Sequence, residues 1–138
     1  MELESLQVIE VQDNNIKGTI PTTIGALTNL KILYLNNNNL EGTIPTELFS
    51  LSGSLTAVNF GSNRLDGRLS KGWGSLTNLQ VLQLYNNSFS GTLPDAVYGL
   101  NNLGEHSSSM KLSVFFMKRI LRTTSAFFLS LILSNYQR

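Results

Sequence analysis

Apolar residues recur along this chain in phrases that repeat every 24 or 25 residues. The phrases begin at Leu6, Leu30, Leu55 and Leu79, and a last one stops at Leu103. Within each phrase two apolar residues are spaced by two, as Leu33 and Leu35 are, which predicts an extended strand with one buried side. Because such a strand cannot bury its apolar side alone, the repeats predict four parallel strands stacked around a continuous core.

An asparagine follows each predicted strand at the same position. The four are Asn14, Asn38, Asn63 and Asn87. The chain must turn at this position, which leaves backbone groups unpaired, and a buried amide side chain can both donate to and accept from such groups. We therefore predict a hydrogen-bonded asparagine ladder along the solenoid. A ligand-binding role is the alternative, but the apolar neighbours draw the segment inside: Ile16, Leu40, Leu65 and Phe89.

Each phrase continues with a glycine and then, in three phrases of four, with a proline. The glycines are Gly18, Gly42, Gly67 and Gly91, where a tight bend favours a residue without Cβ. They lie in no strand–GxGxxG–helix setting, so phosphate binding is not supported. Apolar residues three apart then predict a short helical turn on the outer face, and we place the largest of them, Trp73, in the core.

These positions combine into LxxLxLxxNxLxGxIP, and the chain resembles the plant-specific type of leucine-rich repeat protein. The resemblance covers Leu3 to Leu103. It implies an α/β repeat solenoid, a right-handed superhelix with a parallel β-sheet on its concave face and a second short strand near Gly-Thr-Ile-Pro. The family includes ectodomains of receptor-like kinases and receptor-like proteins, polygalacturonase inhibitors and surface antigens, so the resemblance implies recognition instead of catalysis.

Charge divides the chain into two parts. Residues 1–103 contain five Lys or Arg and eight Asp or Glu, whereas residues 104–138 contain five and one. We therefore predict a repeat domain over residues 1–103 and a separate linker and tail over residues 104–138. The net charge of +1 argues against a nucleic-acid-binding protein, which would need a clustered basic face.

The tail allows three interpretations. It forms a helix that caps the last repeat, it is spurious sequence from a shifted frame or an unspliced intron, or it is a basic segment that lies on a membrane surface. A transmembrane helix is disfavoured, because residues 114–133 contain Lys118, Arg119 and Arg122.

The amino terminus and the catalytic residue types also constrain the interpretation. The first residues contain no secretory signal, and Leu3 occupies the repeat position of Leu27. We therefore expect that the chain opens inside a repeat, as a fragment, a truncated gene model or a protein that has lost its amino-terminal cap. The chain has no cysteine and one histidine, His106. We therefore expect no enzyme activity, no cofactor and no metal site.

Residues between the buried positions of each strand are expected to point outward on the concave face. We predict that this face binds a ligand through Glu10, Gln12, Tyr34, Asn36, Asn59, Gln83 and Tyr85. Tyr34 and Tyr85, which we place one rung apart, are the expected anchors, because tyrosine offers a large contact area and a polar tip. The alternative is that these residues are only the solvated side of a sheet.

Three functional hypotheses follow. The first is a non-catalytic recognition module from a receptor-like or cell-surface protein, with a protein or peptide ligand, a possible co-receptor, and membrane association only through missing parts or weakly through the tail. The second is a free-standing scaffold or inhibitor. The third is the ectodomain of a receptor-like kinase whose catalytic domain is absent from this chain. If the protein is secreted, Asn86 in Asn86-Asn87-Ser88 is a candidate N-glycosylation site.

Overall fold

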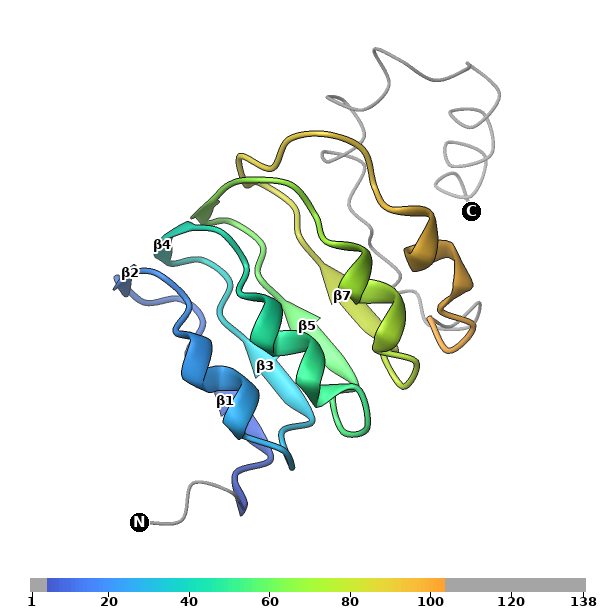
Figure 1. The fold of residues 1–138 in the computed structure, drawn as a ribbon. Helices are drawn as coiled ribbons and strands as arrows, with labels where there is room; N and C mark the ends of the chain where they lie inside the picture. Colours follow the sequence, from blue (N-terminus) through green and yellow to red (C-terminus); the bar gives the residue numbers. More distant parts are fainter. Residues whose placement is uncertain (1–4, 104–138) are drawn as a thin grey trace, which may run out of the picture.

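The computed structural model describes residues 5–103, and these residues form a solenoid of four stacked repeats (Figure 1). Each repeat runs from a strand through a turn and an extended segment to a short helix, and then returns to the next strand. The predictions about the tail at residues 104–138, and about His106 within it, lie outside the described residues. The domain boundary predicted after Leu103 coincides with the end of the described residues, so the structure describes only its amino-terminal side.

The main sheet has four parallel strands in the order β1-β3-β5-β7. Their bounds are β1 Val8–Glu10, β3 Ile32–Tyr34, β5 Ala57–Asn59 and β7 Val81–Gln83. Each residue pairs with the residue at the same repeat position in the next strand, so that Glu10, Tyr34, Asn59 and Gln83 form one line across the sheet. The predicted parallel sheet is confirmed.

A second sheet lies beside the first and contains three short parallel strands in the order β2-β4-β6. These are β2 Lys17–Gly18, β4 Asn39–Gly42 and β6 Arg64–Leu65. In the fourth repeat, a single bridge between Arg68 and Ser90 continues the pairing. The strands end near the glycines, and Gly42 has a φ of +74°, a left-handed conformation that costs glycine little. The second strand that the resemblance implied is therefore present, and in β2 and β4 it ends at the glycine of the Gly-Thr-Ile-Pro segment.

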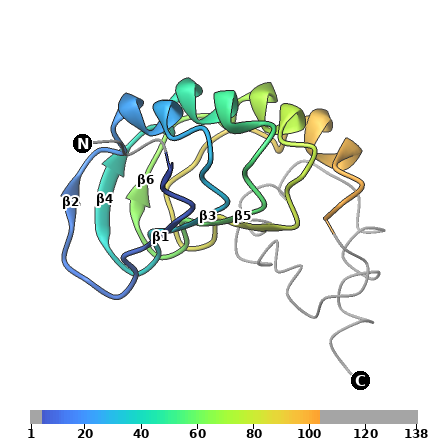
Figure 2. The same cartoon turned by 90° about the horizontal axis from the view of Figure 1, so that it is seen from below.

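Four 3₁₀ helices form the outer side of the solenoid, opposite the main sheet (Figure 2). They are η2 Thr22–Ala26, η3 Thr46–Leu51, η4 Lys71–Ser75 and η5 Asp95–Gly99. A proline in extended conformation precedes three of them, where its missing N–H is not needed. Ser70 replaces that proline before η4, and its hydroxyl accepts a hydrogen bond from the Gly72 amide at 3.0 Å. A side-chain cap therefore takes the place of the proline.

The core lies between the main sheet and the helices. Leu33, Val58 and Leu82 are buried under the sheet, and Trp73 is 1% exposed from the helical side. The Trp73 ring packs edge-on against Phe49, with ring centroids 5.4 Å apart. The prediction that Trp73 belongs to the core is confirmed.

The first repeat differs from the other three. Ile16 was expected inside, but it is 39% exposed, whereas Leu40, Leu65 and Phe89 at the same position are buried. Asn14 is likewise exposed and not buried. Both differences have one cause, because each repeat is covered on its amino-terminal side by the repeat before it, and no described repeat precedes the first.

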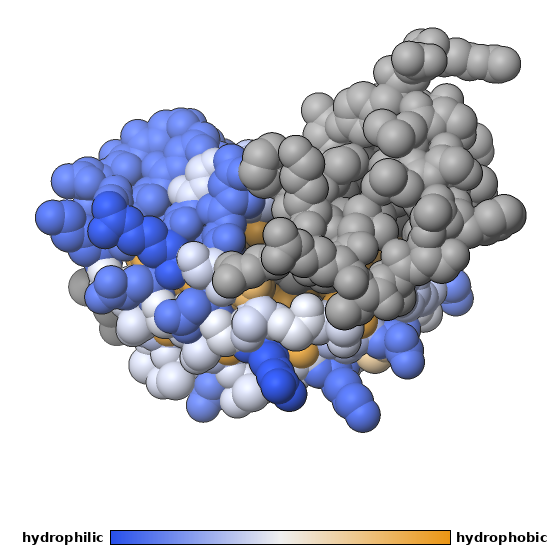
Figure 3. Space-filling model, turned by 90° about the horizontal axis from the view of Figure 1, so that it is seen from above, coloured by the Kyte–Doolittle hydropathy of each residue, from blue (hydrophilic) through white to orange (hydrophobic). Residues whose placement is uncertain are grey.

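On the face seen in Figure 3, the visible described residues are mostly hydrophilic or of intermediate hydropathy, with smaller hydrophobic areas between them. Within residues 5–103, no helix is long and apolar enough to cross a membrane.

Candidate functional site: the concave face of the sheet

The concave face is the face of the main sheet that points away from the 3₁₀ helices. The parallel pairing continues past the ends of the strands, since the Asp13 amide donates to the Asn36 carbonyl at 3.1 Å and the Asn37 amide to the Gly61 carbonyl at 2.9 Å. Alternation along the strands therefore gives three rows across the face. The first row is Val8, Ile32, Ala57 and Val81, the middle row Glu10, Tyr34, Asn59 and Gln83, and the third row Gln12, Asn36, Gly61 and Tyr85.

The middle row holds four of the seven residues predicted to contact a ligand. Glu10 is exposed, whereas Tyr34, Asn59 and Gln83 are half-buried. The Asn59 side chain is already engaged, because its oxygen accepts a hydrogen bond from the Gly61 amide at 3.0 Å. The middle row therefore presents the Glu10 carboxylate beside the Tyr34 ring, and the Gln83 amide beyond Asn59.

The third row differs from the sequence-based expectation in two ways. Asn36 belongs to the concave face as expected, but its side chain is only 8% exposed. Tyr34 and Tyr85 were expected one rung apart, but β5 lies between their strands, since Tyr34 belongs to the second repeat and Tyr85 to the fourth. The Tyr85 ring lies over Gly61 instead, where an added Cβ would meet ring carbons at 2.4 Å.

A column of left-handed residues follows the third row, and sequence reasoning missed it. The column consists of Asp13, Asn37, Ser62 and Asn86, with φ between 50° and 58°. Asp and Asn tolerate this conformation better than other non-glycine residues, so their occurrence in three repeats was a usable signal. The Asn37 amide donates to the Asp13 carboxylate at 2.7 Å, and the Asn86 amide donates to the Ser62 hydroxyl at 3.3 Å.

The next column contains the asparagines at the ladder positions. In Asn38, Asn63 and Asn87, the side-chain nitrogen donates to a carbonyl of the preceding repeat, at Val11, Leu35 and Phe60 respectively, each at 2.9 Å. Their side-chain oxygens accept the amides of Ile16, Leu40 and Leu65 at 2.9–3.0 Å. Asn14 donates only to carbonyls of its own repeat, Val11 and Gln12.

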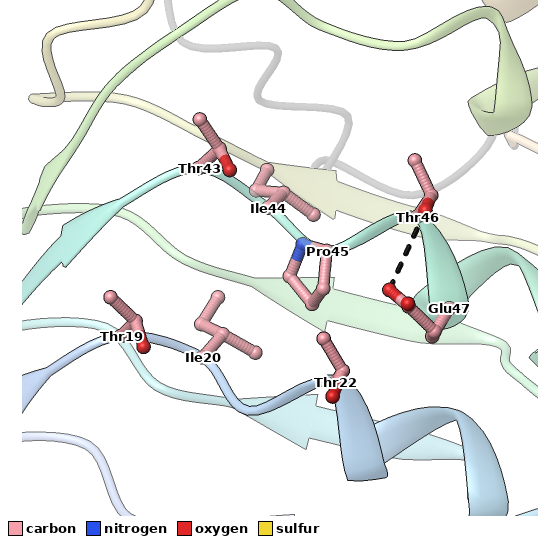
Figure 4. A pocket seen from close by; sticks show the side chains of 8 residues that line it. All are labelled: Thr19, Ile20, Thr22, Thr43, Ile44, Pro45, Thr46 and Glu47. Carbon is pink, nitrogen blue, oxygen red and sulfur yellow. Dashed lines mark hydrogen bonds between the residues drawn. The ribbon is translucent and has the colours of Figure 1, made fainter.

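A separate groove lies between the first two repeats, away from the concave face (Figure 4). It has a volume of about 390 Å³ and is lined by Thr19, Ile20, Thr22, Thr43, Ile44, Pro45, Thr46 and Glu47. The Thr46 hydroxyl lies 3.5 Å from a Glu47 carboxylate oxygen. The lining offers hydroxyls and one carboxylate for hydrogen bonding, but no histidine, cysteine or lysine that would act as a base or nucleophile beside them.

The described region holds few groups suited to metal binding or acid–base chemistry. Residues 5–103 contain no cluster of three or more His, Cys, Asp or Glu side chains that would hold a metal ion. The acidic side chains of the concave side, Glu10 and Asp13, belong to neighbouring positions of one repeat.

Two family descriptions match the chain. Leucine-rich repeats in two copies match residues 4–50, and a single leucine-rich repeat matches residues 78–100. A comparison with curated proteins found no match.

Solved structures of plant receptor ectodomains resemble this fold. The leucine-rich repeat ectodomain of the membrane receptor kinase GASSHO1/SCHENGEN3 from Arabidopsis thaliana, in complex with CASPARIAN STRIP INTEGRITY FACTOR 2, is 37% identical over 72% of this chain, with a TM-score of 0.69. The plant peptide hormone receptor RGFR1 in complex with RGF2 is 34% identical over 72% of this chain, with a TM-score of 0.70. The BIR3–SERK2 complex from Arabidopsis thaliana is 32% identical over 69%, with a TM-score of 0.65.

This chain spans only part of each of those proteins. It covers 12% of the GASSHO1/SCHENGEN3 chain, 16% of the RGFR1 chain and 52% of the matched chain in the BIR3–SERK2 complex.

Proposed function

Because the chain belongs to the plant type of the leucine-rich repeat family, we propose that it is a non-catalytic recognition module whose concave face binds a peptide or protein. One observation carries the proposal. On this face the four repeats carry different residues at equivalent positions, such as Glu10, Tyr34, Asn59 and Gln83. At the buried apolar, asparagine and glycine positions, by contrast, all four repeats carry the same residue types. A constant frame with a variable face is typical of a binding surface.

The comparisons support this proposal. GASSHO1/SCHENGEN3 and RGFR1 are both described in complexes with a protein or peptide partner, and they share about a third of their residues with this chain over the matched region. We extend the proposal to location, because ectodomains of membrane receptors lie outside the cell. On this proposal, the chain is part of a receptor-like or cell-surface protein, and a co-receptor with a similar repeat domain is a further partner.

Tyr34 and Tyr85 are the proposed anchors. Each side chain is half-buried, so its ring is held in place while part of it stays available to a ligand. Tyrosine combines a rigid apolar ring with a polar tip, and it is enriched among residues that contribute most to protein–protein binding. Their separation by β5 suits a ligand that crosses several strands instead of one compact group.

The test uses peptides selected from a random library against the full chain. We expect Tyr34→Ala to weaken the selected peptides by about tenfold or more, as for a residue that anchors a partner. Tyr98→Ala is the matched control, because Tyr98 is 66% exposed on η5, outside the concave face. Peptides that lose affinity with Tyr98→Ala and keep it with Tyr34→Ala would place binding on the helical side and refute the proposal.

Asn86 is the proposed glycan acceptor if the protein is secreted. Asn86 is exposed and Asn87 is held in the ladder positions, so the accessible asparagine is the one that starts the sequon. Expression in a secretory plant system should add a mass that peptide N-glycosidase removes and that Ser88→Ala abolishes. An unmodified secreted chain would show that the sequon is not used.

A further inference from the structure

Two side-chain oxygens in the third row are enclosed and unpaired. The oxygen of the Asn36 amide and that of the Gln12 amide are both buried, and neither has a hydrogen-bond partner. The two residues are neighbours across the sheet, because the Asp13 amide donates to the Asn36 carbonyl and the Val11 amide to the Tyr34 carbonyl. Buried acceptors are nearly always satisfied in proteins, so two adjacent exceptions require an explanation.

An aromatic ring continues the same row. Gly61 follows Asn36 in the row, and the Tyr85 ring lies directly over it, in space that any side chain at position 61 would fill. Tyr85 is only half-buried, so one part of the ring remains available to a ligand that lies along the row. The third row therefore combines two carbonyl-type acceptors with an aromatic face.

The charge near these acceptors is negative. Glu10 is the one charged residue in the three rows, and Asp13 directly follows Gln12. The five cations of residues 5–103 are Lys17, Lys31, Arg64, Arg68 and Lys71, and none belongs to a row. A ligand group that donates several hydrogen bonds and carries positive charge matches this surface in both respects.

We propose that the third row of the concave face binds the guanidinium group of an arginine in the ligand. The guanidinium has five N–H donors and no acceptor, so it can satisfy the Gln12 and Asn36 oxygens together when the two amide groups, whose oxygens are enclosed in the free chain, turn toward the ligand. Its planar face stacks on aromatic rings, as Tyr85 offers, and its charge is favoured by Glu10 and Asp13. This inference rests on the proposed function and specifies the ligand that the concave face selects.

A lysine fits the same surface less well. Its ammonium is a compact and strongly hydrated point charge, which loses more hydration than a guanidinium when it enters an enclosed site. It also lacks a planar face for stacking on the Tyr85 ring. The row therefore favours arginine over lysine, and a neutral isostere of arginine isolates the contribution of charge.

The experiment titrates the full 138-residue chain, labelled with ¹⁵N, with the acetylated and amidated tripeptide Gly-Arg-Gly. The same tripeptide with citrulline is the ligand control, because citrulline keeps the shape of arginine but lacks its charge. We expect the arginine peptide to shift the side-chain amide signals of Gln12 and Asn36. We also expect it to bind about tenfold more tightly than the citrulline peptide, as for hydrogen bonds to a charged group.

Three variants separate this inference from a change in folding. Asn36→Leu removes one acceptor and should weaken the arginine peptide by about tenfold, whereas Gln12→Glu adds negative charge and should strengthen its binding. Gln80→Leu makes a similar replacement at an exposed position outside the rows and should change nothing. Each variant's amide spectrum reports whether it is folded.

Equal binding of the arginine and citrulline peptides, or unchanged binding by Asn36→Leu, would overturn the inference. So would a wild-type chain that binds neither peptide. The proposed function would stand in each case if Tyr34→Ala still weakened the library-selected peptides, so the two failures can be told apart.

Discussion

Two columns of residues, only two positions apart in each repeat, behave in opposite ways. The ladder column has asparagine in every repeat, and Asn38, Asn63 and Asn87 repeat the same hydrogen bonds with the same distances. The third row of the concave face has four different residues, and its Gln12 and Asn36 oxygens are enclosed without a partner. The ladder positions therefore hold the repeats together, whereas the residues of the third row differ from repeat to repeat. The candidate arginine-binding groups lie in the third row.

Removing a ladder asparagine should have the largest effect on stability. Asn38→Leu leaves the Ile16 amide without its side-chain partner and removes one of the two side-chain donors to the Val11 carbonyl, which keeps the Asn14 amide. We expect the free energy of unfolding to fall by about 2 kcal/mol, since one orphaned backbone group costs about 1–3 kcal/mol. Urea denaturation of the full chain measures this change.

Asn14→Leu is the matched control for this prediction. Asn14 is the first asparagine of the same column, but it is exposed and bonds only to carbonyls of its own repeat. The same replacement should therefore cost less than about 1 kcal/mol. Equal losses for Asn14→Leu and Asn38→Leu would show that hydrogen bonds between repeats contribute no more to stability than hydrogen bonds within a repeat.

Adding a methyl group under the Tyr85 ring should have a smaller effect. In Gly61→Ala the new Cβ would lie 2.4 Å from ring carbons, so the ring must move aside. Because the ring is the far end of a flexible side chain, we expect a loss of about 1 kcal/mol, with a clear change in the Tyr85 ring signals by NMR. Gly53→Ala, which has no atom within 4 Å of the new Cβ, should leave stability and these signals unchanged.

The smallest predicted effect is a stabilisation. Ser62 is the one residue of the left-handed column that is neither Asp nor Asn, and its φ is 55°. Asn adopts this conformation more readily than Ser, so Ser62→Asn should raise the free energy of unfolding by about 0.5 kcal/mol. A destabilised variant would show that the hydrogen bond from Asn86 to the Ser62 hydroxyl outweighs the backbone preference.

The frame could be predicted from the sequence because each repeat puts its residues in the same surroundings. This is why the parallel strands and the burial of Trp73 follow from spacing alone. The same reasoning failed at Asn14 and Ile16, because a column argument assumes a neighbouring repeat on both sides. The left-handed column was predictable from its Asp and Asn residues, yet its signal is weaker than that of the apolar positions.

The binding face was less predictable, for a physical reason. The exposure of a variable residue depends on which residue lies beside it in the next strand, and the repeat pattern does not specify that neighbour. The Tyr85 ring lies over the third row because position 61 is glycine. Nothing in the pattern of one repeat predicts the enclosed oxygen of Asn36.

The most direct test of the central claim compares Asn38→Leu with Asn36→Leu by urea denaturation. The residues are two apart and undergo the same replacement, but Asn38 satisfies backbone groups of the preceding repeat, whereas the Asn36 oxygen is unpaired. We predict a loss of about 2 kcal/mol for Asn38→Leu and a change within about 1 kcal/mol, or a gain, for Asn36→Leu. Equal losses at the two positions would contradict the division into a constant frame and a variable face.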